Sequence, residues 1–180
     1  MLLAQLAAFE PSNGHEAAMV LRTRQFVETH TDCFERSQQS GHVTGSAWVI
    51  DLDRKHVLLT HHLKLDKWLQ PGGHADGDPD VLAVAMREAI EETGLEMIRP
   101  VSRKIFDVDV HSIPGRDGEP AHYHYDIRFV FQADRALPLR KSAESKALGW
   151  VKLTEVDRLT DEESVMRMVR KTLQFREQHD

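Results

Sequence analysis

The sequence has little of the chemistry that stabilises secreted or membrane proteins. Cys33 is its one cysteine, which excludes an internal disulfide; we expect a buried thiol there and a cytoplasmic protein. No apolar run approaches the roughly 18 residues that cross a bilayer, and the N-terminal residues lack the basic segment of a signal peptide. A net charge of −6 argues against a broad basic surface for nucleic acid. Neither nucleic acid nor membrane is therefore an expected partner.

What is present is a mixture of helical and strand patterns in irregular order, which predicts an α+β fold in which a mixed sheet lies between helices. Three parts are expected: a helical N-terminal extension over 1–41, a main domain over 42–155, and a C-terminal helix over 156–180 that packs on that domain. The extension contains two helices, separated by Pro11-Ser12-Asn13-Gly14. Apolar alternation and β-branched residues predict strands over 43–50, 56–60, 105–111, 122–131 and 148–153. Little regular structure is expected over 61–80, and the chain ends in an amphipathic helix over about 162–176.

The clearest helix covers 79–93. Asp78 suits its N-cap, Pro79 its first position, and Gly94 its end. Helical spacing places Leu82, Met86, Ala89 and Ile90 toward the core, and it groups three acids on the opposite face, Glu88, Glu91 and Glu92.

These three carboxylates have two interpretations: a solvated acidic face, or a site for a hard divalent cation such as Mg²⁺ or Mn²⁺, which relieves their mutual repulsion. The segment 73–96 contains seven acids and one base, so it alone has a charge of −6 and the rest of the chain is neutral. The acidity of the protein is therefore one concentrated patch.

The spacing of this segment resembles the Nudix box. Gly73 is followed at fixed distance by Arg87-Glu88-Ala89-Ile90-Glu91-Glu92-Thr93-Gly94-Leu95, and Trp68-x-x-Pro71-Gly72-Gly73 leads into it. One position departs from the family pattern, since Pro79 replaces the first box glutamate, which usually braces the box arginine. Asp76, Asp78 or Asp80 could brace Arg87 instead. The resemblance implies an α/β/α layered Nudix fold.

The resemblance also implies a metal-dependent hydrolase of a phosphoanhydride bond in a nucleoside diphosphate linked to another moiety. Glu88, Glu91 and Glu92 would then hold Mg²⁺ or Mn²⁺, and Glu92 or the loop acid Glu144 would orient or deprotonate the attacking water. Arg87 would orient the helix and loop, and Gly72 and Gly73 would allow tight turns. Many relatives form homodimers. The alternative is a catalytically silent Nudix module that binds a nucleotide or a protein partner, and Pro79 is its best support.

Two later strands have polar faces. Asp107, Asp109 and His111 alternate on one, and His122, His124, Asp126 and Arg128 alternate on the other. Paired as a hairpin, the strands would bring these side chains together. The face is then either a solvated outer surface or the wall of a substrate pocket or second metal site.

A comparison with the isopentenyl diphosphate isomerases, which share the Nudix fold, sharpens the second interpretation. These enzymes have a histidine at the place of His74, and acids of their later strand complete a metal site near the positions of His124 and Asp126. Gly72 stands where they have a catalytic cysteine, so isomerase chemistry is not expected. A histidine-containing metal site at His74, His124 and Asp126 is left as a hypothesis.

Overall fold

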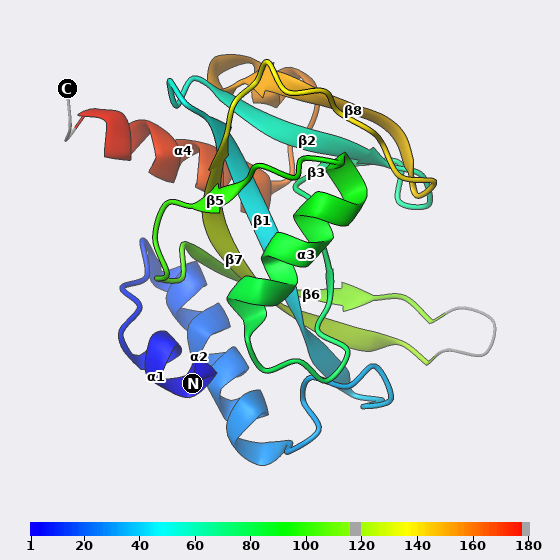
Figure 1. Cartoon of the computed structure of the whole chain (residues 1–180). Helices are drawn as coiled ribbons and strands as arrows, with labels where there is room; N and C mark the ends of the chain where they lie inside the picture. The colour runs from blue at the N-terminus through cyan, green and yellow to red at the C-terminus, as the bar shows by residue number, and fades with distance from the viewer. Residues whose placement is uncertain (116–119, 178–180) are drawn as a thin grey trace. The chain divides into compact units, whose positions relative to one another are not determined.

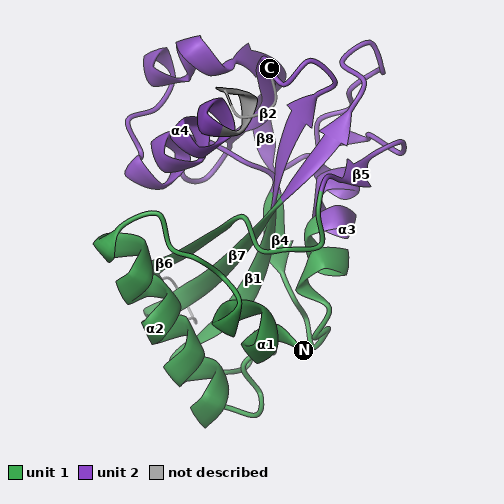
Figure 2. Cartoon of the chain, turned by 90° about the vertical axis from the view of Figure 1, so that its left-hand side faces the viewer, with its two compact units in different colours: residues 1–46, 72–85, 102–129 green, residues 47–71, 86–101, 130–180 purple. Residues whose placement is uncertain are grey.

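The computed structural model describes residues 1–115 and 120–177, and the side chains up to residue 174. Gly118 of the loop between the polar strands and the side chain of Phe175 thus lie outside the described part. The chain divides into two compact units (Figure 2). Unit 1 comprises residues 1–46, 72–85 and 102–129, and unit 2 comprises residues 47–71, 86–101 and 130–180. No helix among the described residues is long and apolar enough to cross a membrane.

Unit 1 begins with the two predicted helices, α1 (Leu2–Ala7) and α2 (Gly14–Thr29) (Figure 1). Asn13 caps α2, because its side chain accepts a hydrogen bond from the Glu16 N–H at 2.9 Å. The Glu16 carboxylate in turn accepts from the Ser12 N–H at 2.6 Å, so two free donors are satisfied reciprocally. Phe26 on α2 stacks on Tyr125 with ring centroids 4.0 Å apart, which fixes the helix against the strands.

The strands of unit 1 include the predicted hairpin, β6 (Asp107–Ile113) with β7 (His122–Ala133). These strands pair antiparallel, and the register places Asp107 opposite Arg128, Asp109 opposite Asp126 and His111 opposite His124. β1 (Gly41–Asp51) pairs with the short strand β4 (Gly72–His74) in the same unit. Both β1 and β7 continue into unit 2.

The polar face of the hairpin is not a solvated surface over its inner half, so that interpretation is wrong there. Arg128 is 2% exposed, and Asp107, Asp109 and Asp126 are also buried. The guanidinium of Arg128 donates to Asp126 at 2.7 Å and to Asp107 at 3.2 Å, and it lies 3.4 Å from Asp109. Burial alone would lower the pKa of Arg128, but these three carboxylates raise it, so the cation is retained.

Helix α3 (Val81–Thr93) begins two residues later than expected. The side chain of Asp80, rather than Asp78, accepts a hydrogen bond from the first turn, from the Ala83 N–H at 3.3 Å. Asp78 instead accepts from the Asp80 N–H at 2.9 Å, which holds the preceding turn and leaves Pro79 outside the helix. Gly94 ends α3 as predicted, with a φ of +71° that favours glycine.

Unit 2 contains β2 (His56–His62), β3 (Trp68–Leu69), β5 (Arg99–Pro100) and β8 (Ser145–Lys152). The described strands are hydrogen-bonded in the order β3-β2-β1-β7-β5, with β8 also on β2. A 3₁₀ turn, η1 (Leu153–Arg158), leads to α4 (Glu163–Glu177). The fully buried Trp48 donates through Nε1 to Thr172 on α4 at 2.8 Å, which fixes that helix on β1. The expected α+β class is confirmed, although β3 and β4 form within a segment predicted to be irregular.

Candidate functional site

The acidic face of α3 is carried by one continuous helix (Figure 1). Leu82 and Ala89 are buried on its other face, as predicted, whereas Met86 and Ile90 are only half-buried. Of the three glutamates, Glu91 is the most open, with a side chain 63% exposed, and that of Glu88 is 16% exposed. The three carboxylates therefore differ in exposure: Glu91 is open to solvent, whereas Glu88 and Glu92 are half-buried.

Arg87 pairs with the acids of its own helix. Its guanidinium donates to Glu88 at 3.0 Å and lies 4.0 Å from Glu91. Asp76, a candidate brace for Arg87, forms a two-pronged ion pair with Arg36, in which Nη2 donates to Oδ2 at 2.8 Å. The carboxylates of α3 do not form a set of three converging donors in the structure, since among the described residues only three histidines do so within 4.8 Å. Arg87 supplies the positive charge that limits repulsion on this face.

The loop that precedes β8 is tied to the end of α3 by backbone hydrogen bonds. The Arg140 N–H donates to the Thr93 carbonyl at 2.8 Å, and the Ser142 N–H donates to the Glu92 carbonyl at 3.3 Å. Two residues further on, the Glu144 carbonyl accepts from the Leu63 N–H at 2.7 Å, and its side chain is exposed. The exposed carboxylate of Glu144 thus belongs to a loop anchored beside Glu92.

Gly72 and Gly73 do not form tight turns, which corrects that expectation: both lie in β4, opposite Ser46 and Gly45. Glycine is required at 72 for close approach, because a Cβ there would lie 2.2 Å from the Ser46 hydroxyl. Gly45 has the same role, since its Cβ would lie 2.9 Å from the carbonyl of Val81 at the start of α3. These two glycines allow backbone and helix to approach β1.

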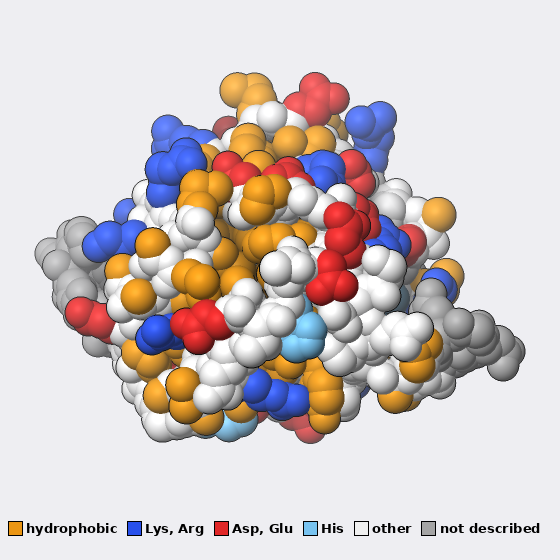
Figure 3. Space-filling view, turned by 90° about the horizontal axis from the view of Figure 1, so that it is seen from below, with side chains coloured by type: hydrophobic (Ala, Val, Ile, Leu, Met, Phe, Trp, Pro, Cys, Tyr) orange, Lys and Arg blue, Asp and Glu red, His pale blue; other side chains and the backbone are white. Residues whose placement is uncertain are grey.

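Three histidines meet within unit 1: His42 on β1, His74 on β4 and His124 on β7. One nitrogen from each lies within 4.8 Å of the others. Ring centroids are 4.9 Å apart for His42 and His74, 4.8 Å for His42 and His124, and 5.0 Å for His74 and His124. Most of this imidazole surface is covered, and only small areas of histidine reach the face shown in Figure 3.

The structure brings His74 and His124 together as hypothesised, but their third companion is His42 rather than Asp126. Asp126 is engaged elsewhere, because it accepts from Thr44 at 3.0 Å, from Ser46 at 2.8 Å and from Arg128. His42 was missed by the sequence interpretation. No local signal identifies it: His42 and Thr44 share one face of β1, but only the pairing of Thr44 with His74 in the structure shows that His42 lies nearby.

All three imidazoles are neutral at pH 7. Burial, aided by neighbouring cationic groups, lowers the pKa of His42 and of His74 to about 4. Burial also lowers the pKa of His124 to about 2, with His111 as the next cause. A neutral imidazole retains one nitrogen lone pair, and this is the protonation state that binds metal.

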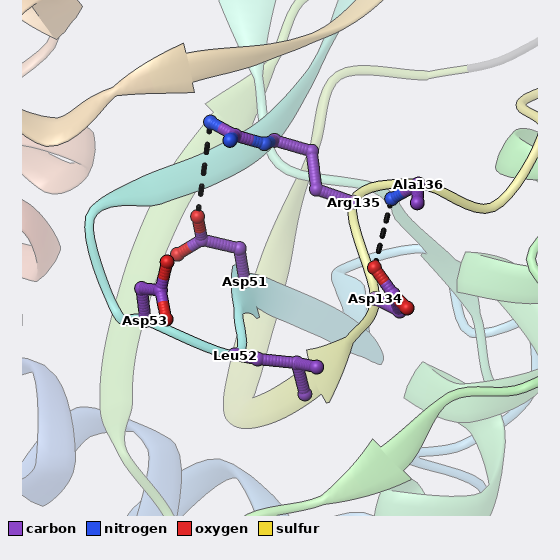
Figure 4. A pocket seen from close by; sticks show the side chains of 6 residues that line it. All are labelled: Asp51, Leu52, Asp53, Asp134, Arg135 and Ala136. Atoms are coloured by element: carbon purple, nitrogen blue, oxygen red, sulfur yellow. Dashed lines mark hydrogen bonds and ion pairs between the residues drawn. The ribbon is translucent and has the colours of Figure 1, made fainter.

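A separate surface pocket of roughly 360 Å³ lies in unit 2 (Figure 4). Its lining comprises Asp51, Leu52, Asp53, Asp134, Arg135 and Ala136. Asp51 is already held by the backbone N–H groups of Lys55 and His56, at 2.7 and 3.0 Å. None of the residues singled out in the sequence lines this pocket, and its best-placed carboxylate has a structural role.

Comparison with known proteins identifies the family. The family model of the NUDIX domain matches residues 42–172, which is well over half of the chain. Among solved structures, the chain is similar to a C. elegans Ap4A hydrolase in a binary complex, with a TM-score of 0.58, 18% identity, and coverage of 74% of this chain and 96% of that one. No curated protein matches.

Two further structures share the fold. A MutT protein from Methanosarcina mazei Go1 has a TM-score of 0.53 and 18% identity over 79% of this chain and 99% of its own. The NUDIX domain of Shewanella oneidensis NrtR, complexed with ADP ribose, has a TM-score of 0.51 and 16% identity over 83% of this chain and 97% of its own. The box residues, the α+β fold and the family match agree, and the chain therefore belongs to the Nudix family.

Proposed function

We propose that this protein hydrolyses a phosphoanhydride bond in a nucleoside diphosphate derivative, with the acids of α3 as the metal-binding residues. The observation that carries the proposal is the anchoring of the loop 140–144 to the end of α3. Two backbone hydrogen bonds from this loop reach Thr93 and Glu92, which supports a role for Glu144 beside the acids of the helix. Glu144 is therefore our proposed fourth carboxylate, in addition to the three of the box.

The donors of α3 have the chemistry that suits a hard divalent ion, and their side chains would rotate to converge on it. Glu88, Glu91 and Glu92 offer carboxylate oxygens, the ligands that Mg²⁺ and Mn²⁺ favour. When bound, such an ion would neutralise the phosphate charge and lower the pKa of bound water. Arg87 holds Glu88 at 3.0 Å, which keeps that carboxylate in place.

Activation of the attacking water is assigned to carboxylates of the protein. Glu92 and Glu144 are the candidates to orient the attacking water and accept its proton, since a general base must lie within hydrogen-bond reach of the proton it takes. Gly94, at positive φ, ends the helix against Arg140, where a Cβ would lie 2.9 Å from the Arg140 Cβ. The glycine thus allows the loop that carries Glu144 to approach the helix end.

A catalytically silent module that binds a nucleotide or a partner is the second candidate. One observation favours it: Pro79 replaces an acid of the box, and it is exposed and outside α3. The protein then lacks one carboxylate of the family pattern, while the fold that binds nucleotides is retained. The NrtR domain, which has the same fold, is complexed with ADP ribose.

A hydrolysis assay that resolves the nucleotide products by chromatography separates the two candidates, because cleavage of these compounds yields nucleotides, pyrophosphate or a sugar phosphate rather than free phosphate. The full-length protein is assayed with Mg²⁺ or Mn²⁺ against nucleoside triphosphates, Ap4A and ADP ribose, which include the compounds named for the fold neighbours. Hydrolysis of one of these compounds is expected, with a loss of at least about 100-fold in kcat for Glu92→Gln and for Glu91→Gln. Nucleotide binding without turnover on any compound would overturn the proposal in favour of the silent module.

Glu96→Gln is the matched control. Glu96 is an acid just beyond α3, its side chain is 81% exposed, and it lies 3.9 Å from Arg140. Because it carries the same charge as Glu92 but lies outside the acidic face of the helix, its variant should retain wild-type kcat. A loss as large in Glu96→Gln as in Glu92→Gln would show that net charge, rather than metal binding on α3, causes the effect.

A further inference from the structure

The three histidines of unit 1 form a cluster that the hydrolytic proposal does not use. His42, His74 and His124 come from three different strands, and each ring contacts the other two, with centroids 4.8 to 5.0 Å apart. A fourth imidazole is adjacent, since His122 Nε2 lies 3.3 Å from His124 Nε2. The fold therefore concentrates imidazoles at one point, where the register of β4 on β1 fixes His74 opposite Thr44.

The second observation is the state of His42. Its side chain is 4% exposed, and both of its ring nitrogens are buried without a hydrogen bond of normal geometry to any described residue. In native proteins almost all buried polar atoms have a hydrogen-bond partner, so the buried imidazole of His42 is expected to have a bound partner. A metal ion would be such a partner, because it accepts the nitrogen lone pair to which no N–H or O–H group donates.

The neighbouring acid does not provide that partner. Asp126, two residues from His124 on β7, already accepts from Thr44 and Ser46 and pairs with Arg128. Asp76, two residues from His74, is held by Arg36. The cluster is thus built from imidazoles, and the nearest carboxylates are committed to cations and hydroxyls.

We infer that His42, His74 and His124 bind a late first-row divalent metal, of which Zn²⁺ is the expected ion. Three neutral imidazoles are a known donor set for tetrahedral Zn²⁺, at bonds of about 2.0–2.1 Å. In a tetrahedral site with these bond lengths, the donor nitrogens lie about 3.4 Å apart. The three nitrogens now lie within 4.8 Å of one another, so small side-chain rotations would bring them to that spacing. The site differs in donor chemistry from the glutamates of α3, because nitrogen ligands select Zn²⁺ over Mg²⁺.

Titration with Zn²⁺ tests the inference on the full-length protein after removal of metals with a chelator. Isothermal titration at pH 7 in the presence of millimolar Mg²⁺ should show one Zn²⁺ per chain. His74→Ala and His124→Gln should weaken its binding by more than the ~10–100-fold that loss of an outer-shell partner costs. His15→Ala is the matched control, since His15 is an exposed histidine on α2 and its loss should leave Zn²⁺ affinity unchanged.

Two further measurements keep the result independent of variant folding and of hydrolysis. In the wild-type protein with ¹⁵N-labelled histidine, Zn²⁺ should shift the ring nitrogens of His42, His74 and His124 and leave those of His15 unchanged. Glu92→Gln, which is expected to lose hydrolysis, should bind Zn²⁺ like the wild type. Absence of stoichiometric Zn²⁺ binding by the wild type, or equal binding by the histidine variants, would overturn the inference and leave the hydrolytic proposal intact.

Discussion

Arg128 and Asp126, two residues apart on β7, form an ion pair of 2.7 Å in which both side chains are buried. Residues at this spacing share one face of a strand, so the pair is local, and β6 adds Asp107 and Asp109 from the opposite strand. One guanidinium therefore faces three carboxylates inside unit 1. This arrangement leads to the first prediction.

Arg128→Ala should destabilise the protein by about 3–5 kcal/mol, because it leaves buried carboxylates without their cation. Arg128→Lys should recover only part of this, since an ammonium cannot reproduce the forked donation of a guanidinium. Urea unfolding measures both. Arg24→Ala, which removes an exposed pair with Glu28 at 3.6 Å, should change stability by less than about 0.5 kcal/mol. Equal effects of the Arg128 and Arg24 variants would contradict the prediction.

The bond between Trp48 and Thr172 gives a second prediction. The Thr172 hydroxyl donates to the Met168 carbonyl and accepts from Trp48, both at 2.8 Å. Thr172→Val preserves shape but leaves the Trp48 N–H buried without an acceptor, at a cost of about 1–3 kcal/mol. Thr23 is a matched control, because it is buried and also donates to a carbonyl one turn earlier, at 2.8 Å. Thermal unfolding of Thr23→Val and Thr172→Val should show a clearly larger loss for the second.

The close contact between Gly72 on β4 and Ser46 on β1 gives a third prediction, about stability. Gly72→Ala would place a Cβ 2.2 Å from the Ser46 hydroxyl, so β1 and β4 must shift, at about 1–3 kcal/mol. At Gly149 on β8 nothing lies within 4 Å of the added atom. Gly149→Ala should therefore be neutral or stabilise by about 0.4–1 kcal/mol, through lower entropy of the unfolded chain. Denaturant midpoints of the two variants test this, and a loss of stability in Gly149→Ala similar to that in Gly72→Ala would refute it.

Asp51 predicts a dependence of stability on pH. Burial alone would raise the pKa of Asp51, but hydrogen bonds from the His56 and Lys55 N–H groups and from the His56 ring lower it overall. Because the folded-state pKa is depressed, this stabilisation is present above the unfolded value of about 4 and is lost as the pH falls through the folded value. Asp51→Asn should thus cost about 1–2 kcal/mol at pH 7, and the difference from wild type should shrink below about pH 4.

Urea unfolding from pH 3 to 7 tests this dependence. Asp53→Asn, at an exposed position two residues away, serves as the control and should show no such trend. A constant difference between Asp51→Asn and wild type over the whole range would show that the carboxylate charge does not contribute.

Glu144 provides a prediction about activity that rests on the proposed function. If its carboxylate accepts the proton of the attacking water, Glu144→Gln should lower kcat by about 10²–10⁴-fold with little change in KM. Glu155→Gln, at a surface acid that pairs with Lys152 and Arg158, should be without effect. A wild-type kcat in Glu144→Gln would leave Glu92 as the remaining candidate.

The hairpin and the helix of the box were predictable because their signals are local. Alternation between 105 and 131 gave the correct face for each polar residue, and Gly94 marked the end of α3. Burial of Arg128 was not predictable, because one sequence does not show which face of a strand is covered. His42 was missed for a related reason: its partners lie on β4 and β7, and only tertiary pairing places them nearby.

The first residue of α3 was also not predictable from the sequence. Asp78 and Asp80 are equally suitable as caps by composition, and the choice depends on the turn that closes between Ala75 and Asp78, whose N–H donates to the Ala75 carbonyl at 3.0 Å. Such short-range competition shifts boundaries by one or two residues without altering the element.

The bonds that hold the loop 140–144 on α3 have a consequence for divergence among relatives. Arg140 and Ser142 donate through their backbone N–H groups and Glu144 accepts from Leu63 through its carbonyl, so these three bonds do not depend on side-chain identity. Two side chains add to them: Lys141 donates to the Ser145 carbonyl at 3.0 Å, and the Ser142 hydroxyl accepts from the Glu144 N–H at 3.2 Å. Ala143 is exposed and its methyl group forms neither kind of bond, so we expect relatives to differ at position 143 with the least effect on the loop.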